Sequence, residues 1–142
     1  MTPVVADTVV VPLASESDAR ETCAVLREEL DPGTRVVVVH VIEKGGGGLD
    51  KASVAQREET AEDVFAVARG ELEGFDVETR ILYDTDVAET ITSGADDVGA
   101  DLIVFSPRQA SRLSRLLSGD VALDLITGTD RPVLVLPSGE GS

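Results

Sequence analysis

Short apolar runs alternate along the chain with segments in which apolar residues recur every three or four positions. Thr8–Leu13 and Arg35–Ile42 are typical of strands, and the second is an almost unbroken valine run, as expected of a parallel strand covered on both faces. Three further strands are predicted at Phe75–Leu82, Asp101–Ser106 and Pro132–Leu136.

Four amphipathic helices are predicted between these strands. The first follows Ser15-Glu16-Ser17-Asp18, which has the spacing of a capping box, and Asp86 can cap the third. Gly128 is a stop signal for the fourth. In chain order, the apolar stripes are Ala19, Cys23, Leu26, Leu30; Val54, Ala61, Val64, Phe65, Ala68, Leu72; Val87, Ile91, Ala95, Val98; and Val121, Ala122, Leu125, Ile126.

Alternation of strands and helices indicates an α/β fold with right-handed crossovers. We expect residues 1–142 to form a single doubly wound, Rossmann-like domain, with a five-stranded parallel sheet of order 3-2-1-4-5 flanked by four helices. Gly45–Gly48 predicts a flexible connection, and Ser138–Ser142 predicts a disordered tail. A glycine run without a following Lys-Ser/Thr is not a P-loop, although a lid role stays open.

The composition indicates one domain with a sizeable core. With 142 residues and 42% apolar content, the chain can bury roughly two-thirds of its unfolded surface. Its apolar runs are far shorter than the ~20 residues of a membrane span, and the N-terminus does not resemble a signal peptide. Cys23 is the single cysteine. These features predict a cytoplasmic protein without direct membrane insertion.

Acidic residues dominate the charge. The 27 Asp and Glu against 12 Lys and Arg give a formal net charge of -15, which argues against nucleic acid as a partner. The carboxylates are dispersed rather than gathered in a tail, a pattern that favours a halophilic protein soluble at very high salt. An ordinary acidic mesophilic protein is the alternative.

One window reverses this charge. Leu102–Gly119 contains no Asp or Glu, yet carries Arg108, Arg112 and Arg115, and it begins with the predicted fourth strand. Ligands of doubly wound sheets bind outside the carboxyl ends of the strands, so this cationic window predicts an anion site. Alternatively, the arginines pair with surface carboxylates and hold a loop in place.

Several segments together resemble the universal stress protein family. The resemblance covers essentially the whole chain and depends on the order and spacing of its parts. They are Val9-Val10-Val11-Pro12, His40-Val41, Ala100-Asp101-Leu102-Ile103-Val104, the stretch Leu113 to Ala122, and Arg131-Pro132-Val133-Leu134-Val135.

The ATP-binding branch of that family resembles G-x2-G-x9-G-S/T after strand four, with an Asp after strand one at the adenosine end. On this chain the glycine positions fall at Ser106, Gln109 and Gly119, the hydroxyl position falls at Asp120, and Ala14 stands at the adenosine end. Loss of two glycines reshapes a phosphate cradle, and a carboxylate repels phosphate. The resemblance therefore implies a degenerate site.

The resemblance implies nucleotide or anion contacts from two loops, one after the first predicted strand and one after the fourth. Arg108 can offer forked donors, with hydroxyls from Ser111 and Ser114 beside it, while Asp120 can instead act as a helix cap. No cofactor is certain, and ATP or another nucleotide stays a candidate. The candidate residues are Pro12, Leu13, Ala14, Ser15, Val41, Ser106, Arg108, Gln109, Arg112, Ser118, Gly119, Asp120 and Val121.

The residues do not suggest an enzyme. His40 is the only histidine, so it supports neither a metal site nor a catalytic triad, and we interpret it as structural. Cys23 lies on an apolar stripe and is expected to act as a small buried hydrophobe. No metal ligands and no catalytic residues are expected.

The resulting hypothesis is a universal stress protein-like module in stress response or regulation that binds ATP weakly or not at all. One alternative is retained binding of ATP or another phosphorylated nucleotide or anion, and another is an interaction module regulating a membrane transporter or enzyme through a protein partner. The resemblance implies a homodimer that pairs its last strand through Val133, Leu134, Val135 and Leu136. An exposed apolar edge strand agrees with such pairing.

Overall fold

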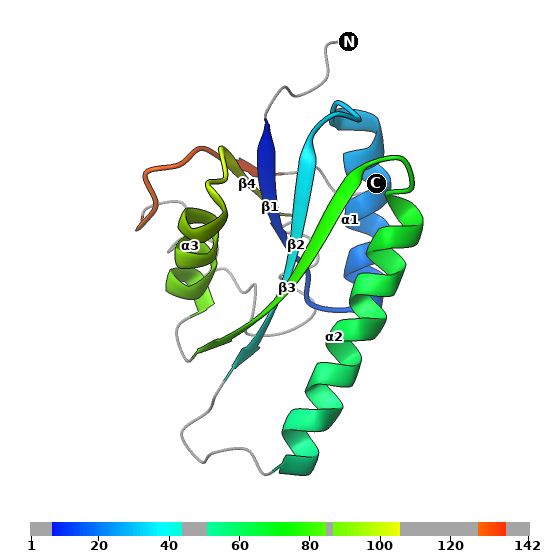
Figure 1. Ribbon diagram of the computed structural model, residues 1–142, viewed down its shortest axis with the longest axis vertical. Coiled ribbons are helices and arrows are strands. Elements are labelled where there is room, and N and C mark those ends of the chain that lie inside the picture. The colour runs from blue at the N-terminus through cyan, green and yellow to red at the C-terminus, as the bar shows by residue number, and fades with distance from the viewer. Residues whose placement is uncertain (1–6, 44–50, 85–86, 106–127, 136–142) are drawn as a thin grey trace.

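Five parallel strands form the centre of the fold (Figure 1). The computed structural model describes residues 7–43, 51–84, 87–105 and 128–135. The sheet has the order β3-β2-β1-β4-β5, which confirms the predicted order. The strands are β1 (Thr8–Pro12), β2 (Arg35–Glu43), β3 (Asp76–Asp84), β4 (Leu102–Phe105) and β5 (Val133–Val135).

The helices cover the two faces of the sheet. Helices α1 (Glu16–Glu29) and α2 (Lys51–Glu71) pack side by side, and α3 (Val87–Val98) lies on the opposite face (Figure 1). The sheet is therefore doubly wound, as the alternating pattern predicts. The residues predicted to form a fourth helix, 121–126, lie outside the described part of the chain, as do Gly45–Gly48, Asp86 and the tail 138–142.

Strand boundaries differ from the predicted ones by one or two residues. Leu13 follows β1 rather than ending it, although its N–H still donates to the Val39 carbonyl at 2.9 Å. Strand β3 begins one residue later and ends two residues later than predicted. Hydrophobic patterns identify strands reliably, but their ends depend on the register of the neighbouring strand.

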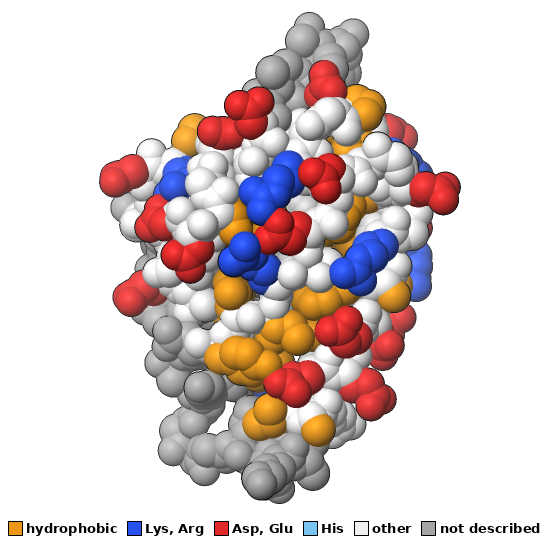
Figure 2. Space-filling model, in the orientation of Figure 1, with side chains coloured by type: hydrophobic (Ala, Val, Ile, Leu, Met, Phe, Trp, Pro, Cys, Tyr) orange, Lys and Arg blue, Asp and Glu red, His pale blue; other side chains and the backbone are white. Residues whose placement is uncertain are grey.

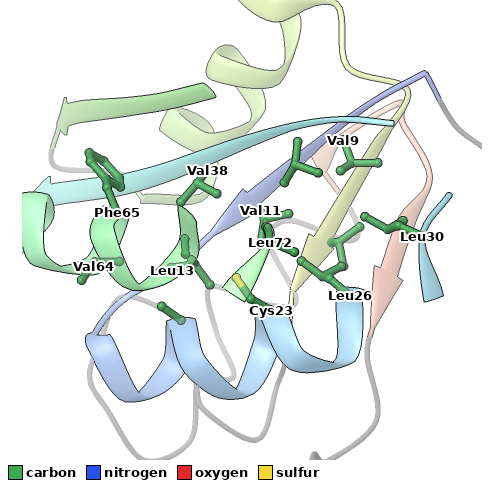
Figure 3. Packing of buried hydrophobic residues seen from close by; sticks show 14 of the residues in the cluster. Val9, Val11, Leu13, Cys23, Leu26, Leu30, Val38, Val64, Phe65 and Leu72 are labelled. Atoms are coloured by element: carbon green, nitrogen blue, oxygen red, sulfur yellow. The ribbon is translucent and has the colours of Figure 1, made fainter. Parts of the chain in front are cut away.

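The larger core cluster fills the space between the sheet and helices α1 and α2. Val9 and Val11 of β1 belong to this cluster together with Leu26 of α1 and Phe65 of α2 (Figure 3). Cys23 is also in this cluster, and burial raises the pKa of its thiol to about 12. Its predicted role as a small buried hydrophobe is therefore confirmed.

A second cluster lies on the α3 face. The alternate residues of the same strands, including Val10 and Val37, pack there against Ile91 and Ala95 of α3. Every residue of β1 is buried, because both of its faces are covered and its two edges pair with β2 and β4. The continuous valine runs of β1 and β2 reflect this double burial.

Hydrogen bonds and ion pairs connect the C-terminal end of α3 to the sheet. Arg35 pairs with Glu78 of β3 and lies 3.4 Å from the carbonyl of Val98. Arg131, just before β5, pairs with Asp96 of α3. Cations near a helix C-terminus interact favourably with its unpaired carbonyls. In the view of Figure 2, basic side chains near the middle of the surface lie beside acidic ones, and further acidic side chains surround them.

We expect Phe65→Ala to destabilise the protein by about 3–5 kcal/mol, because it opens a cavity in the cluster between α2 and the sheet. Chemical denaturation at constant salt measures this change. Glu62→Ala, at an exposed position of the same helix, is the control and should change the free energy of unfolding by less than about 0.5 kcal/mol. Equal effects of the two substitutions would contradict the described packing.

Candidate functional site

The candidate site lies at the carboxyl edge of the sheet, where β1 is shorter than its neighbour β2. Paired residues of β1 and β2 run from Thr8 with Arg35 to Pro12 with Val39. Strand β2 then continues to Glu43, still paired with β3 on its other edge. Beyond Val39, the N–H and carbonyl groups of β2 that point toward β1 therefore lie past Pro12, the last residue of β1.

The turn from β1 to α1 is organised by a helix cap. Ser15 is the N-cap, and its hydroxyl accepts a hydrogen bond from the Asp18 N–H at 3.0 Å. This confirms the predicted capping function of Ser15. In the usual capping box the carboxylate reaches the N–H of the cap residue itself, whereas Asp18 Oδ2 accepts from the N–H of Ala14 at 2.8 Å.

Asp18 is a buried carboxylate whose oxygens both accept hydrogen bonds. Only 1% of the residue is exposed, and its Oδ1 accepts from the Thr22 hydroxyl at 2.8 Å. Burial raises its pKa, while the hydrogen bonds from Ala14 and Thr22 act in the opposite direction. Asp18 thus places a carboxylate at the N-terminus of α1, where the helix dipole favours negative charge.

His40 holds the other side of the same turn. Its Nδ1 lies 2.8 Å from the carbonyl oxygen of Leu13, and the residue is buried. Since a carbonyl only accepts, Nδ1 carries the hydrogen in this contact. Burial lowers the pKa of His40, which favours the neutral imidazole. The interpretation of His40 as a structural residue is consistent with this bond.

Val41 and Ala14 belong to different elements but pack in the same core cluster. The Val41 side chain belongs to the cluster on the α3 face, and Ala14 packs against the same cluster. Two residues before Val41, the Val39 carbonyl accepts from Leu13, so Val39 directs its backbone groups toward β1. Val41 directs its own N–H and carbonyl the same way, because backbone direction alternates along a strand.

The structure brings the candidate residues of the first two strands to one edge. Pro12, Leu13, Ala14 and Ser15 form the end of β1 and the turn, and Val41 lies beside them on β2. β4 ends at Phe105, next to β1 in the sheet. The remaining candidates lie outside the described residues: Ser106, Arg108, Gln109, Arg112, Ser118, Gly119, Asp120 and Val121.

The described part of this edge offers hydrogen-bonding groups and apolar contacts rather than a metal centre. Within residues 7–43, 51–84, 87–105 and 128–135, no group of three His, Cys, Asp or Glu side chains could hold a metal ion. No helix among those residues has the length and hydropathy needed to cross a membrane.

Two functions of side chains at this edge do not follow from sequence patterns. The sequence identifies Asp18 as a capping residue, but its bond to the N–H of Ala14 depends on the path of the turn. The bond from His40 to the Leu13 carbonyl depends on the register of β1 and β2. A histidine next to the end of a buried valine strand is the available signal, and it does not identify the acceptor.

Residues 6–137 match the model of the universal stress protein family. The stress response protein NhaX of Bacillus subtilis is 35% identical over 80 residues, covering 56% of this chain and 48% of that protein. The chain thus matches about half the length of this relative.

Two solved structures from Archaeoglobus fulgidus share the fold over almost their whole length. One, a universal stress protein, is 28% identical, with 96% of this chain and 99% of that chain covered and a TM-score of 0.67. The other is a universal stress protein in complex with dAMP, 26% identical, with 96% and 98% covered and a TM-score of 0.65.

The raised pKa of Asp18 predicts a pH-dependent effect of Asp18→Asn. The folded protein binds this proton more tightly than the unfolded chain, so the contribution of Asp18 is greatest below about pH 4 and declines as pH rises through the folded pKa. The free energy of unfolding of Asp18→Asn minus that of the wild-type protein should therefore increase between about pH 3.5 and about pH 7.

Denaturation at a series of pH values and constant salt measures this difference. Asp97→Asn, an exposed position on α3, is the control for loss of one carboxylate. A difference that moves in favour of the wild-type protein as pH rises would contradict the dominant effect of burial at Asp18.

Proposed function

Because the chain belongs to the universal stress protein family, we propose that it acts as a stress-response module without catalytic activity, whose nucleotide site has diverged from the ATP-binding pattern. In this proposal the protein binds ATP weakly or not at all. It works as a homodimer and regulates its targets through contacts rather than through chemistry.

The residues and hydrogen bonds of the β1–α1 turn are the main support for this proposal. Ala14 stands where the ATP-binding pattern has a carboxylate, so its side chain cannot accept a hydrogen bond from a nucleoside. Its N–H is already bonded to Asp18, and the Leu13 carbonyl is already bonded to His40. The hydrogen bonds of these two backbone groups are made within the chain and need no ligand.

The substitutions in the phosphate loop support the same proposal. Ser106 and Gln109 replace two glycines of the pattern, and a Cβ at such positions keeps the backbone from approaching a phosphate closely. Asp120 replaces the hydroxyl residue and brings a charge of the same sign as the phosphate. Together, these changes weaken both ends of the ATP site.

Retained binding of a nucleotide is the second candidate function, and the overhang of β2 favours it. The backbone N–H and carbonyl of Val41 face the region past the end of β1, next to the apolar side chain of Ala14. An adjacent donor and acceptor can pair with the edge of a nucleobase. The relative from Archaeoglobus fulgidus that was solved with dAMP supports this alternative.

Titration with ATP, AMP and inorganic phosphate in multimolar KCl tests these two functions by calorimetry. We expect no binding of ATP at millimolar concentration. Millimolar or tighter binding that is lost in Arg108→Ala would establish the second function instead. Binding that is unchanged in Arg108→Ala would show that this arginine is not part of the site.

A restored variant provides the matched control for that titration. Ser106→Gly, Gln109→Gly and Asp120→Ser together rebuild the pattern, and adding Ala14→Asp rebuilds the adenosine end. We expect ATP affinity to increase at least tenfold, which corresponds to about 1.4 kcal/mol. If the restored variant binds no better than wild type, the substitutions are not the cause of weak binding.

The position of β5 supports the proposed dimer. β5 is an edge of the sheet, with β4 as its neighbour, and Val133 and Leu134 are only partly buried. Leu136, the last residue of the proposed interface, lies outside the described part of the chain. A second copy paired with this edge would cover the apolar strand and its unpaired backbone groups.

We expect light scattering in multimolar KCl to give a mass of about twice 14.9 kDa. Leu136→Glu should shift the protein toward the monomer, because it brings two carboxylates together across the two-fold axis. Glu62→Gln on α2 is the control for a single charge change. A monomer under conditions where the wild-type protein is folded would contradict the proposed dimer.

A further inference from the structure

β3 is an edge of the sheet, and every second residue of it directs its backbone groups away from β2. The N–H of Arg35 bonds to the residue before β1, so the alternate residues Val36 and Val38 face β3. In a parallel pair, a residue that faces its neighbour bonds to the residues on either side of its register partner. The register partners of Val36 and Val38 are Val77 and Thr79, which therefore direct their N–H and carbonyl groups outward.

The side chains of these outward-facing residues lie on the face of the sheet that α2 covers. Val77 packs against the cluster between the sheet and the first two helices, and so does Ile81, which continues the same alternation. Thr79 accepts a hydrogen bond from Arg69 of α2 at 2.8 Å. Val77 and Ile81 are only partly buried, and Tyr83 is 39% exposed. The edge of β3 thus presents apolar side chains that α2 covers only in part.

Two opposite charges lie on the other face of the same strand. The carboxylate of Glu78 accepts hydrogen bonds from Arg35 of β2 and from Arg80, the latter at 2.8 Å. These bonds hold the pKa of Glu78 below its usual range, so the carboxylate is charged at neutral pH. β3 lies in front of β2 in Figure 1, and Figure 2 views the same side of the molecule. Basic and acidic side chains lie next to one another there, with hydrophobic side chains below them.

Two β3 strands that run antiparallel about a two-fold axis at Thr79 are complementary to each other. Outward-facing residues then pair with outward-facing residues, so Thr79 lies opposite its own copy and Val77 lies opposite Ile81 of the second copy. On the other face of the joined strands, Glu78 lies opposite Arg80. Because the axis repeats each contact, apolar pairs and ion pairs both occur twice, and such cross-strand pairs stabilise a sheet.

Other antiparallel registers that keep most of β3 paired lack this complementarity. An axis at Arg80 places this residue opposite its own copy, and like charges directly opposite each other destabilise a strand pair. An axis at Ile81 places Arg80 opposite Leu82, so the arginine no longer lies opposite a carboxylate. The sequence of β3 therefore favours the axis at Thr79.

We propose that the outer edge of β3 is a self-association surface, on which a second copy of this chain pairs its β3 antiparallel about an axis at Thr79. β3 and β5 are opposite edges of the sheet, so this pair is separate from the proposed β5 dimer and does not rest on it. α2 packs against β2 as well as β3. Two helices centred over these strand pairs lie about 10 Å apart, which is a normal packing distance.

Repulsion between like charges makes this association weaker than a permanent dimer. Each copy has a net charge of -15, and Arg69 lies beside Thr79, so the axis brings two copies of Arg69 together. At about 1 M salt the screening length is only about 3 Å, which suppresses these repulsions, whereas Glu78 and Arg80 meet directly across the strands. The β3 pair should therefore form in multimolar salt, at higher protein concentration than the β5 dimer.

Disulfide cross-linking in multimolar KCl at high protein concentration tests the register. At Thr79 the paired Cα atoms would be about 5.5 Å apart, within reach of a disulfide, whereas the two copies of Ile81 would be about 14 Å apart along the strands. Thr79→Cys should therefore form a covalent dimer about tenfold faster than Ile81→Cys, the matched control on the same face. Cys23 does not compete, because it is buried and its thiol pKa is raised to about 12. Equal rates for the two variants would overturn the proposal.

A charge exchange in the Thr79→Cys background tests the ion pairs. Arg80→Glu and Glu78→Arg each place like charges opposite each other in a pair of identical chains, so each should lower the cross-linking rate about fivefold. An equimolar mixture of the two variants should restore the rate, because every charge then lies opposite its counterpart. A mixture that cross-links no faster than the separate variants would overturn the proposed register. Circular dichroism shows whether each variant is folded, and if either is not, the comparison of Thr79→Cys with Ile81→Cys decides alone.

Leu136→Glu separates this surface from the proposed β5 dimer. Added to Thr79→Cys, it should leave the cross-linking rate unchanged within about twofold, because it acts at the opposite edge of the sheet. Loss of cross-linking in that variant would show that the covalent dimer depends on the β5 edge, which would overturn the proposal. A wild-type protein that is monomeric at low concentration would contradict the β5 dimer only, and the cross-linking result would stand independently.

Discussion

Pairing of β1 with β2 on one edge and β4 on the other is the interaction on which the rest of the structure depends. Parallel neighbours require crossover connections, and these connections place α1 and α2 on one face and α3 on the other. Alternate residues of β1 consequently enter two different clusters, with Val9 and Val11 in one and Val10 in the other. Substitution of a single β1 residue therefore disturbs one helical layer directly and the other through the strand.

The candidate site lies where the pairing of β1 with β2 ends, because β1 is the shorter strand. Where β1 ends, the backbone loses its ladder partners in a buried place, and side chains must replace them. His40 and Asp18 make the replacement hydrogen bonds at the Leu13–Ala14 peptide. Burial in this position raises the pKa of Asp18. The stability of this turn therefore depends on hydrogen bonds from side chains rather than on the β1–β2 ladder.

Sequence patterns predict the layers of this protein better than the details of its site. The valine runs predict strands that are buried on both faces, and the helical stripes predict the helices between them. The order expected of a doubly wound sheet is then the observed one. The capping function of Ser15 is also predictable, since it depends only on local spacing. The bond between His40 and Leu13 joins residues 27 positions apart and depends on strand register, which composition and periodicity do not encode.

The charge of the protein determines what kind of recognition this edge can use. Arg35 and Arg131 pair with Glu78 and Asp96, so these two cations support the packing of α3 rather than an anion site. A net charge of -15 repels a nucleotide over long range at low salt, whereas at about 1 M salt the screening length is only about 3 Å. Under those conditions neither attraction nor repulsion extends far beyond direct contact. A ligand bound at this edge would then be selected by hydrogen bonds of fixed direction, which groups held on paired strands make at little entropic cost.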